Sequence, residues 1–277
     1  MRIGPFLRYL SMAVVLVFVT SMVVPATGPS TVTTDALNVS VFLFSILSGF
    51  TISILWERLS AVRDALGMET SHLLTIYALS RVFGKNVQKK LADAMDKYVI
   101  LGLHFPLEMY EKSDKAFMEL FKTVEDLKPR TSKQDLVYEE MIGEMEEMED
   151  SRMVTIYTAK LRLLNYLRFS LIALGAIVVG LLFWTRVPTL ESQVLSFSLS
   201  LVVVVIYVVI VELNKLQIWE DALFETNVNR FYDLIGKTVF YDLELIQEGR
   251  HVPKPGEKYR THDKGGRIVT RVWPKKK

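Results

Sequence analysis

The sequence predicts an all-α integral membrane protein, and three observations carry this prediction. Half of the 277 residues are hydrophobic, and the mean hydropathy of +0.26 is high for a water-soluble domain. Four long stretches carry no charged residue. The segment between the second and third stretches has apolar residues at three- and four-residue spacing, as helices do. We therefore predict four transmembrane helices, with long helices extending into a cytoplasmic helical bundle.

The four uncharged stretches are the predicted membrane spans. The charged residues that bound these stretches are Arg8 and Asp35, Asp35 and Glu57, Arg168 and Arg186, and Glu191 and Glu212. Each stretch is close to the ~20 residues that a helix needs to cross a bilayer. The alternative for the first stretch is a cleaved signal peptide, because it ends in small residues at 24–26.

Basic residues set the expected orientation. Residues 27–36 contain no Lys or Arg, and the loop near Pro188 contains only Arg186. The opposite ends of the spans are flanked by Arg2, Arg8, Arg58, Arg63, Arg162, Arg168 and Lys215. Because Lys and Arg favour the cytoplasmic side, we expect a multi-pass protein of the cell membrane with both termini in the cytoplasm.

Five parts follow one another along the chain in this prediction. They are spans one and two (1–56), a cytoplasmic helical insert (57–166), spans three and four (167–213), a cytoplasmic C-terminal helix (214–248) and a basic tail (249–277).

Within the insert, the apolar periodicity predicts that the second span continues to residue 83. Further helices are expected over 87–104, over 107–127 and from 134 into the third span. Gly84 and Asn86 are the expected helix end and next N-cap, and Thr131 or Ser132 is the expected cap after the polar turn at 128–133.

Composition and motifs exclude most enzyme chemistry. The chain has no cysteine, and its four histidines include no pair at the three- or four-residue spacing that chelates metal on a helix. Nucleophile-elbow and phosphate-loop motifs are missing from the sequence. The net charge of +2 does not indicate nucleic-acid binding. We expect no enzymatic activity, no cofactor and no nucleic-acid partner.

A dense acidic cluster occupies residues 139–150 of the insert. Glu144, Glu147 and Asp150 are weak candidates for a divalent cation, because calcium prefers several oxygen ligands. The favoured interpretation is a solvated helix face or a salt-bridge partner for another subunit, so no metal site is predicted. The interleaved methionines Met141, Met145, Met148 and Met153 are interpreted as packing residues.

The tail from 249 to 277 carries ten basic residues against Glu257 and Asp263. On the cytoplasmic side such a tail can lie on anionic lipid, at about 1 kcal/mol per basic residue near the surface. The alternatives are binding to the acidic helix of a neighbouring subunit and a disordered, solubilising tail.

The second span differs from the others in its small and hydroxylated residues. Ser45, Ser48 and Gly49 are therefore candidates either for close helix packing or for lining a water-filled pathway. The fourth span is instead an almost unbroken valine-rich run.

The layout of two spans, a helical insert, two more spans and a C-terminal helix resembles that of bestrophin channels. At the end of the second span, Leu47-Ser48-Gly49-Phe50 and the stretch from Trp56 through Arg58 to Arg63 are similar to the junction where the bestrophin pore helix meets a Trp- and Arg-rich stretch. The sequence is closer still to the prokaryotic bestrophin-like membrane family, over residues 5–245 by layout.

This resemblance implies a homo-oligomer, a pentamer, whose second spans surround an axial pore for passive conduction of small ions, with anions such as chloride favoured. Bestrophins constrict that pore with three apolar side chains one helical turn apart, and Phe42, Ile46 and Phe50 have that spacing here. The alternative is that this stripe packs against the first or fourth span. The alternative for the whole chain is a non-conducting membrane scaffold or signalling protein that recruits partners through its insert and basic tail.

Overall fold

The structure is a computed structural model that describes residues 11, 14, 15, 17–216, 228–247, 252–263 and 266–274. The chain divides into two compact units. The first comprises Met1–Leu59 and Arg162–Ile218, and the second comprises Ser60–Leu161 and Trp219–Lys277.

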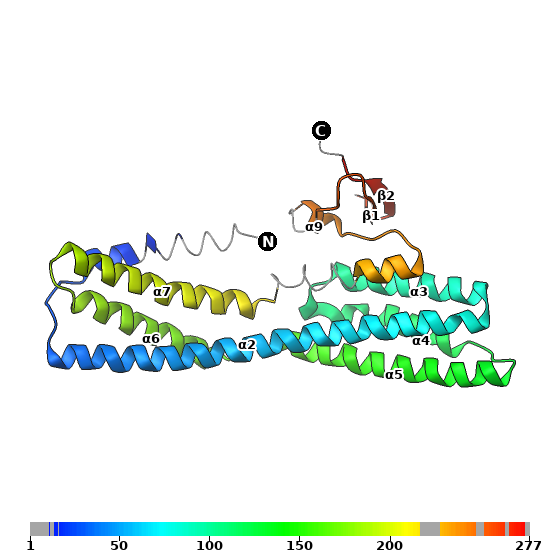
Figure 1. Ribbon diagram of the computed structural model, residues 1–277, viewed down its shortest axis with the longest axis horizontal. Helices are drawn as coiled ribbons and strands as arrows, with labels where there is room; N and C mark the ends of the chain where they lie inside the picture. Colours follow the sequence, from blue (N-terminus) through cyan, green and yellow to red (C-terminus); the bar gives the residue numbers. More distant parts are fainter. Residues whose placement is uncertain are drawn as a thin grey trace. The chain divides into compact units, whose positions relative to one another are not determined.

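Three helices form most of the first unit (Figure 1). They are the first part of α2 (Thr31–Leu79), α6 (Asn165–Trp184) and α7 (Leu190–Asn214). All three are long and apolar enough to cross a membrane. Among the described residues, these are the three helices that qualify. Of the first predicted span, residues 11, 14, 15 and 17–23 are helical, whereas 9, 10, 12, 13 and 16 lie outside the described residues.

The core of the first unit lies where α2 packs against α6 and α7. Its buried apolar side chains are Phe44, Leu55, Leu171, Val178, Leu182 and Ile210. Small residues allow this close packing: a Cβ added at Gly175 of α6 would lie 3.4 Å from the Phe44 ring. In the loop between α6 and α7, Arg186 donates hydrogen bonds to the carbonyl oxygens of Ser21 (2.6 Å) and Val24 (3.0 Å).

Helix α2 confirms the prediction that the second span continues beyond the membrane stretch. It runs without interruption from Thr31 to Leu79 and is followed by a short 3-10 helix, η1 (Ser80–Phe83). Gly84 then takes a positive φ of 94° and serves both as the end of η1 and as the N-cap of α3 (Lys85–His104). Asn86 as the new N-cap was therefore wrong, because the turn at Gly84 needs no intervening residues.

The second unit is a bundle of the remainder of α2 with α3, α4 (Asp114–Glu125) and α5 (Ser132–Lys160). The segment predicted as one helix over 107–127 is a 3-10 helix, η2 (Leu107–Ser113), followed by α4. The predicted cap of α5 is confirmed: the Thr131 hydroxyl accepts a hydrogen bond from the Gln134 N–H. The core contains Met141, Met145 and Met148, which are fully buried, so the packing role predicted for these three is also confirmed.

Helix α5 does not run into α6, contrary to the prediction. It ends at Lys160, and residues 161–164 are not helical. The physical reason is tertiary: the backbone N–H of Leu163 donates to the side-chain oxygen of Asn214 at the end of α7, at 2.9 Å, instead of to its own helix. The spacing of leucines along the chain gives no sign of this hydrogen bond to a distant residue.

The C-terminal part of the second unit corrects the all-α prediction. Residues 228–235 are helical and are followed by α9 (Leu243–Gln247), whereas 217–227 of the predicted 214–248 helix lie outside the described residues. β1 (Lys258–His262) and β2 (Ile268–Val272) then form an antiparallel hairpin. The disordered alternative was therefore wrong for these residues. In β1, Tyr259 and Thr261 are buried whereas Lys258 is exposed, and the count of basic residues does not reveal this alternation.

Candidate functional site

Helix α2 presents two opposite faces in the first unit. Phe44, Ser48, Thr51 and Leu55 recur at three- and four-residue spacing and are all buried against α6 and α7. Phe42, Ile46 and Phe50 lie about half a turn away and are 64%, 55% and 63% exposed. The alternative in which this stripe packs on another span of the same subunit is not what the described residues show. The stripe is instead free to meet a neighbouring subunit, lipid or an axial pathway.

The three small residues proposed for lining a pathway divide between the two faces. Ser45 and Gly49 are exposed, on the side of the apolar stripe, and the Ser45 hydroxyl donates to the Val41 carbonyl at 2.8 Å. Ser48 is only 3% exposed and faces the helix packing. Of these three, Ser45 and Gly49 can therefore share a surface with Phe42, Ile46 and Phe50.

The junction residues have different environments. Arg58 is buried, and its guanidinium donates to the carbonyl oxygen of Asn214 at 3.0 Å, where a cation also meets the negative end of the α7 dipole. Because Asn214 also accepts from Leu163, Arg58 and Asn214 fix three segments at one point. Trp56 is half exposed, and Arg63 is exposed beside Asp64 at 3.3 Å.

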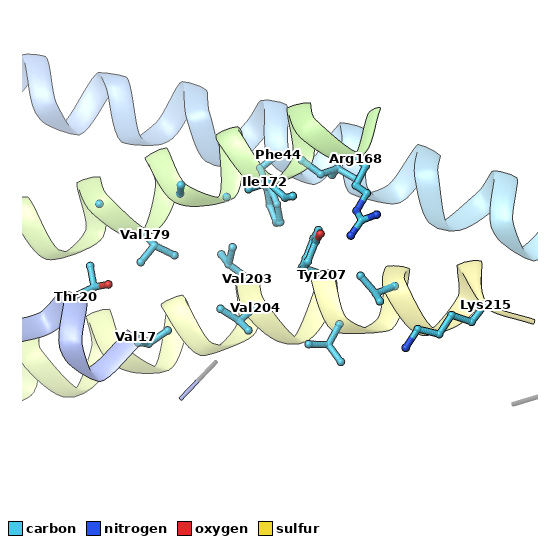
Figure 2. Close-up of a pocket in the computed structure, with 16 residues that line it drawn as sticks. Val17, Thr20, Phe44, Arg168, Ile172, Val179, Val203, Val204, Tyr207 and Lys215 are labelled. Carbon is cyan, nitrogen blue, oxygen red and sulfur yellow. The ribbon is translucent and has the colours of Figure 1, made fainter. Parts of the chain in front are cut away.

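A cavity of about 830 Å³ lies between α6 and α7 (Figure 2). Its walls are mainly apolar, and Arg168 and Lys215 lie toward one end of it, with the Tyr207 hydroxyl nearby. Phe44 is the α2 residue that lines it. The cavity is therefore on the packed side of α2 and is separate from the exposed stripe.

The acidic cluster of α5 is partly engaged within the second unit. Glu144 lies 2.7 Å from Nδ1 of His72, and Glu147 lies 3.8 Å from the same nitrogen. Asp150 is exposed. The three candidate carboxylates therefore do not share one binding point. Glu144 is also not simply part of a solvated face, because it contacts His72 of α2. Met153 is 39% exposed, so the packing role does not extend to it.

Sequence reasoning missed a buried charge network in the second unit. The hydroxyls of Tyr98 and Tyr110 each donate to Glu69 at 2.6 Å, and Arg152 donates to the Tyr98 hydroxyl at 2.7 Å. Arg152 also reaches Asp114 at 2.5 Å. Burial, followed by the charge of Glu69, raises the pKa of both tyrosines well above the ordinary value, so they remain donors. The four main residues come from α2, α3, η2 and α5, and no short spacing could have found them.

A second missed cluster joins the C-terminal segment to α3. Arg260 of β1 donates two hydrogen bonds to Asp96, at 2.6 and 2.7 Å, and Lys237 donates a third at 2.9 Å. Burial alone would raise the pKa of Asp96, but these hydrogen bonds and the two positive charges lower it overall. One of the ten basic residues of the tail is therefore a structural anchor.

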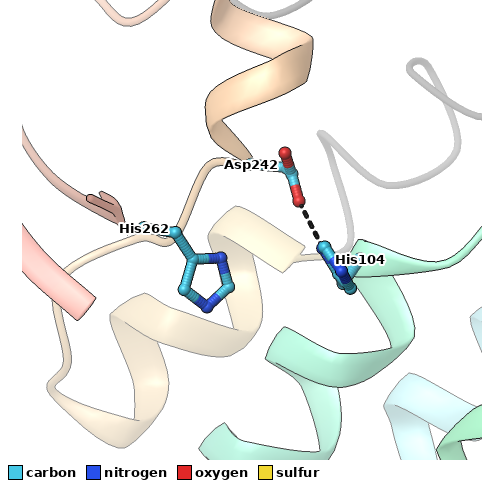
Figure 3. Close-up of side chains that lie close together, drawn as sticks. All are labelled: His104, Asp242 and His262. Atoms are coloured by element: carbon cyan, nitrogen blue, oxygen red, sulfur yellow. Dashed lines mark hydrogen bonds and ion pairs between the residues drawn. The ribbon is translucent and has the colours of Figure 1, made fainter. Parts of the chain in front are cut away.

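A third missed cluster brings together His104, Asp242 and His262 (Figure 3). Nδ1 of His104 lies 2.9 Å from Asp242, and the rings of the two histidines have centroids 5.7 Å apart. Helical histidine spacing does not reveal this group, because its members are far apart in sequence.

The three long apolar helices, and the apolar side chains that α2 exposes among the described residues, are typical of helical integral membrane proteins. The Bestrophin-like domain model matches residues 8–216, and the chain belongs to this family. The fold is similar to the crystal structure of a point mutant of a bacterial bestrophin homologue from Klebsiella pneumoniae, with a TM-score of 0.62 and 13% identity over 83% of this chain and 99% of that chain. No curated protein matches the chain significantly.

Proposed function

We propose that this chain is one subunit of an oligomeric ion channel whose α2 helices surround an axial pathway. The observation that carries the proposal is the exposed stripe of Phe42, Ile46 and Phe50, opposite the face by which α2 packs on its own subunit. Membership of the Bestrophin-like family and the similar fold of a bestrophin homologue support the same reading.

In such an assembly each residue of the stripe forms one ring around the axis, with successive rings about 6 Å apart. Apolar rings block ions by excluding water, and they open when the ring widens or becomes wet. Conduction is passive, and small anions such as chloride are favoured by the family resemblance. We propose a pentamer in the cell membrane, as the bestrophin resemblance implies. The distribution of basic residues supports placing both termini and the insert in the cytoplasm.

The second candidate function is a non-conducting scaffold that recruits partners through the insert and the basic tail. It is favoured by the exposed basic side chains of the described tail, Lys254, Lys258, Arg267 and Arg271. These residues could bind anionic lipid or an acidic partner. In a scaffold, the stripe on α2 would contact a neighbouring subunit and would not line an ion pathway.

Ion flux from liposomes that contain the purified protein separates the two functions. The variants are Phe42→Ala, Ile46→Ala and Phe50→Ala, alone and combined, with chloride and then potassium as the permeant ion. Phe169→Ala and Ile177→Ala are matched controls, because these α6 residues are 73% and 49% exposed. The channel predicts flux that rises in the stripe variants and is unchanged in the controls.

Silence in both salts, from a protein that is folded and oligomeric, would reject a constitutive channel. Equal changes in the stripe and control variants would show that apolar exposure in general, and not the α2 face, affects the vesicles. Because Phe42 and Phe50 are exposed in the subunit, their truncation should not lower subunit stability by the ~3–5 kcal/mol expected for a buried Phe.

A further inference from the structure

The cluster of His104, Asp242 and His262 has the composition of a transition-metal site. His104 is the last residue of α3, Asp242 precedes α9, and His262 is the last residue of β1. Each offers one ligand atom, and these atoms all lie within 4.8 Å of one another. Figure 3 shows the two imidazole rings and the carboxylate converging from separate segments of the second unit.

The backbone around the cluster holds these segments in register. The N–H of Tyr241 donates to the Arg260 carbonyl at 2.9 Å, and the Arg260 N–H donates to the Val239 carbonyl at 2.8 Å. The residue next to Tyr241 is Asp242, and His262 lies two residues beyond Arg260, on the same face of β1. The position of Asp242 relative to His262 is therefore fixed by main-chain bonds.

The Asp96 pair fixes the same strand face to α3. Asp96 and His104 are eight residues apart on α3 and so lie on one side of it. Arg260 of β1 meets Asp96, and His262 of the same strand reaches His104 with ring centroids 5.7 Å apart. The ion pair between Arg260 and Asp96 therefore holds β1 against α3, so that His262 lies close to His104.

The distances suit a small divalent cation after slight side-chain adjustment. Ligands that bind Zn²⁺ at about 2.0–2.2 Å in a tetrahedron lie about 3.4 Å apart. Nδ1 of His104 and the Asp242 carboxylate are 2.9 Å apart, joined by a hydrogen bond that a metal ion would replace. Two imidazoles and one carboxylate are a ligand set that zinc sites use, with the fourth position left for water.

The surroundings orient the ligands. The Phe105 ring contacts the His104 ring edge-on at 5.1 Å between centroids, and the Phe240 ring contacts His262 at 5.0 Å. The Asp242 side chain is only 9% exposed, whereas His104 is nearly half exposed. The carboxylate is therefore held in the interior while solvent can deliver an ion from the histidine side.

We propose that His104, Asp242 and His262 bind one divalent transition-metal ion, Zn²⁺ in the first instance, which fastens the C-terminal segment to the end of α3. The site is independent of the proposed pathway, because all three ligands belong to the second unit and the stripe belongs to the first. Its occupancy would stabilise the hairpin on the bundle.

The test is a Zn²⁺ titration of the full-length protein in detergent, after tag removal and EDTA treatment, in competition with a chromophoric chelator. The expected stoichiometry is one ion per chain. We expect each of three variants, His104→Ala, Asp242→Asn and His262→Ala, to bind Zn²⁺ about 100-fold more weakly. Loss of a residue that only supports a metal ligand already lowers metal affinity by about 10- to 100-fold, and these variants each remove a ligand. His72→Gln is the control, because His72 pairs with Glu144 outside the cluster.

Further measurements separate loss of metal binding from loss of folding. Circular dichroism must show that each variant is folded, and Zn²⁺ should raise the melting temperature of the wild type and of His72→Gln but not of the cluster variants. Bound Co²⁺ should give the visible absorption of a tetrahedral site in the wild type. Absence of saturable binding to the wild type, or unchanged binding in a folded cluster variant, would overturn the proposal.

Discussion

At the scale of single residues, the second unit depends on a few buried charges. Arg152 is only 2% exposed and its guanidinium lies over the rings of Tyr98, Tyr110 and Phe117, at 4.9–5.4 Å from their centroids. It reaches the Glu69 carboxylate through the Tyr98 hydroxyl. Because a buried charge is costly without its partner, the network makes both charged residues necessary to each other.

Arg152→Met should therefore lower the free energy of unfolding by about 3–5 kcal/mol, since it leaves the Glu69 carboxylate buried without this guanidinium. Chemical denaturation of the full chain in detergent measures the loss. Lys160→Met is the control, because Lys160 pairs with Glu111 at the surface and should cost under ~1 kcal/mol. Adding Glu69→Gln to Arg152→Met should recover part of the loss, and a strictly additive double variant would contradict the coupling.

At the scale of elements, the sequence predicted most helices and missed how they are joined. Uncharged length and apolar spacing were enough for α2, α3, α6 and α7, because these signals are local. The break between α5 and α6 depends on Asn214, which lies 51 residues after Leu163. The hairpin and the three charge clusters likewise depend on residues distant in sequence, such as Asp96 and Arg260. Local sequence patterns carry no signal for such distant pairs.

The hairpin is attached to α3 by Asp96, and this attachment should depend on pH. The pKa of Asp96 is lowered in the folded chain, so its contribution to stability is present above the unfolded value of about 3.9 and is lost as pH falls through the folded value. Asp96→Asn should cost about 1.5–3 kcal/mol at pH 7. The difference between wild type and variant should shrink in acid below about pH 4.

The matched control is Asp93→Asn. Asp93 also pairs with Lys237, at 2.7 Å, but its side chain is 58% exposed, so its removal should cost under ~1 kcal/mol. Denaturation curves at neutral and acidic pH provide both comparisons. An Asp96→Asn loss that is as small as that of Asp93→Asn, or that grows in acid, would contradict the assigned role.

At the scale of the whole molecule, the functional account depends on what faces the exposed side of α2. The stripe was proposed from its spacing and the bestrophin resemblance, and the subunit leaves it exposed while burying Phe44 on the other side. The apolar cavity between α6 and α7 lies on that packed side, so it does not compete for the same role. An axial pathway would form only when several copies bring their α2 faces together.

Thiol accessibility tests this claim most directly, because the natural chain has no cysteine. Ile46→Cys places a single thiol on the stripe, and Ile177→Cys places one on α6 at a side chain of similar exposure. A charged methanethiosulfonate reagent is added to both proteins in liposomes, and labelling is checked by mass. We predict that labelling changes ion flux for Ile46→Cys alone. Labelled Ile46→Cys with unchanged flux, or an equal change for Ile177→Cys, would contradict a pathway along α2.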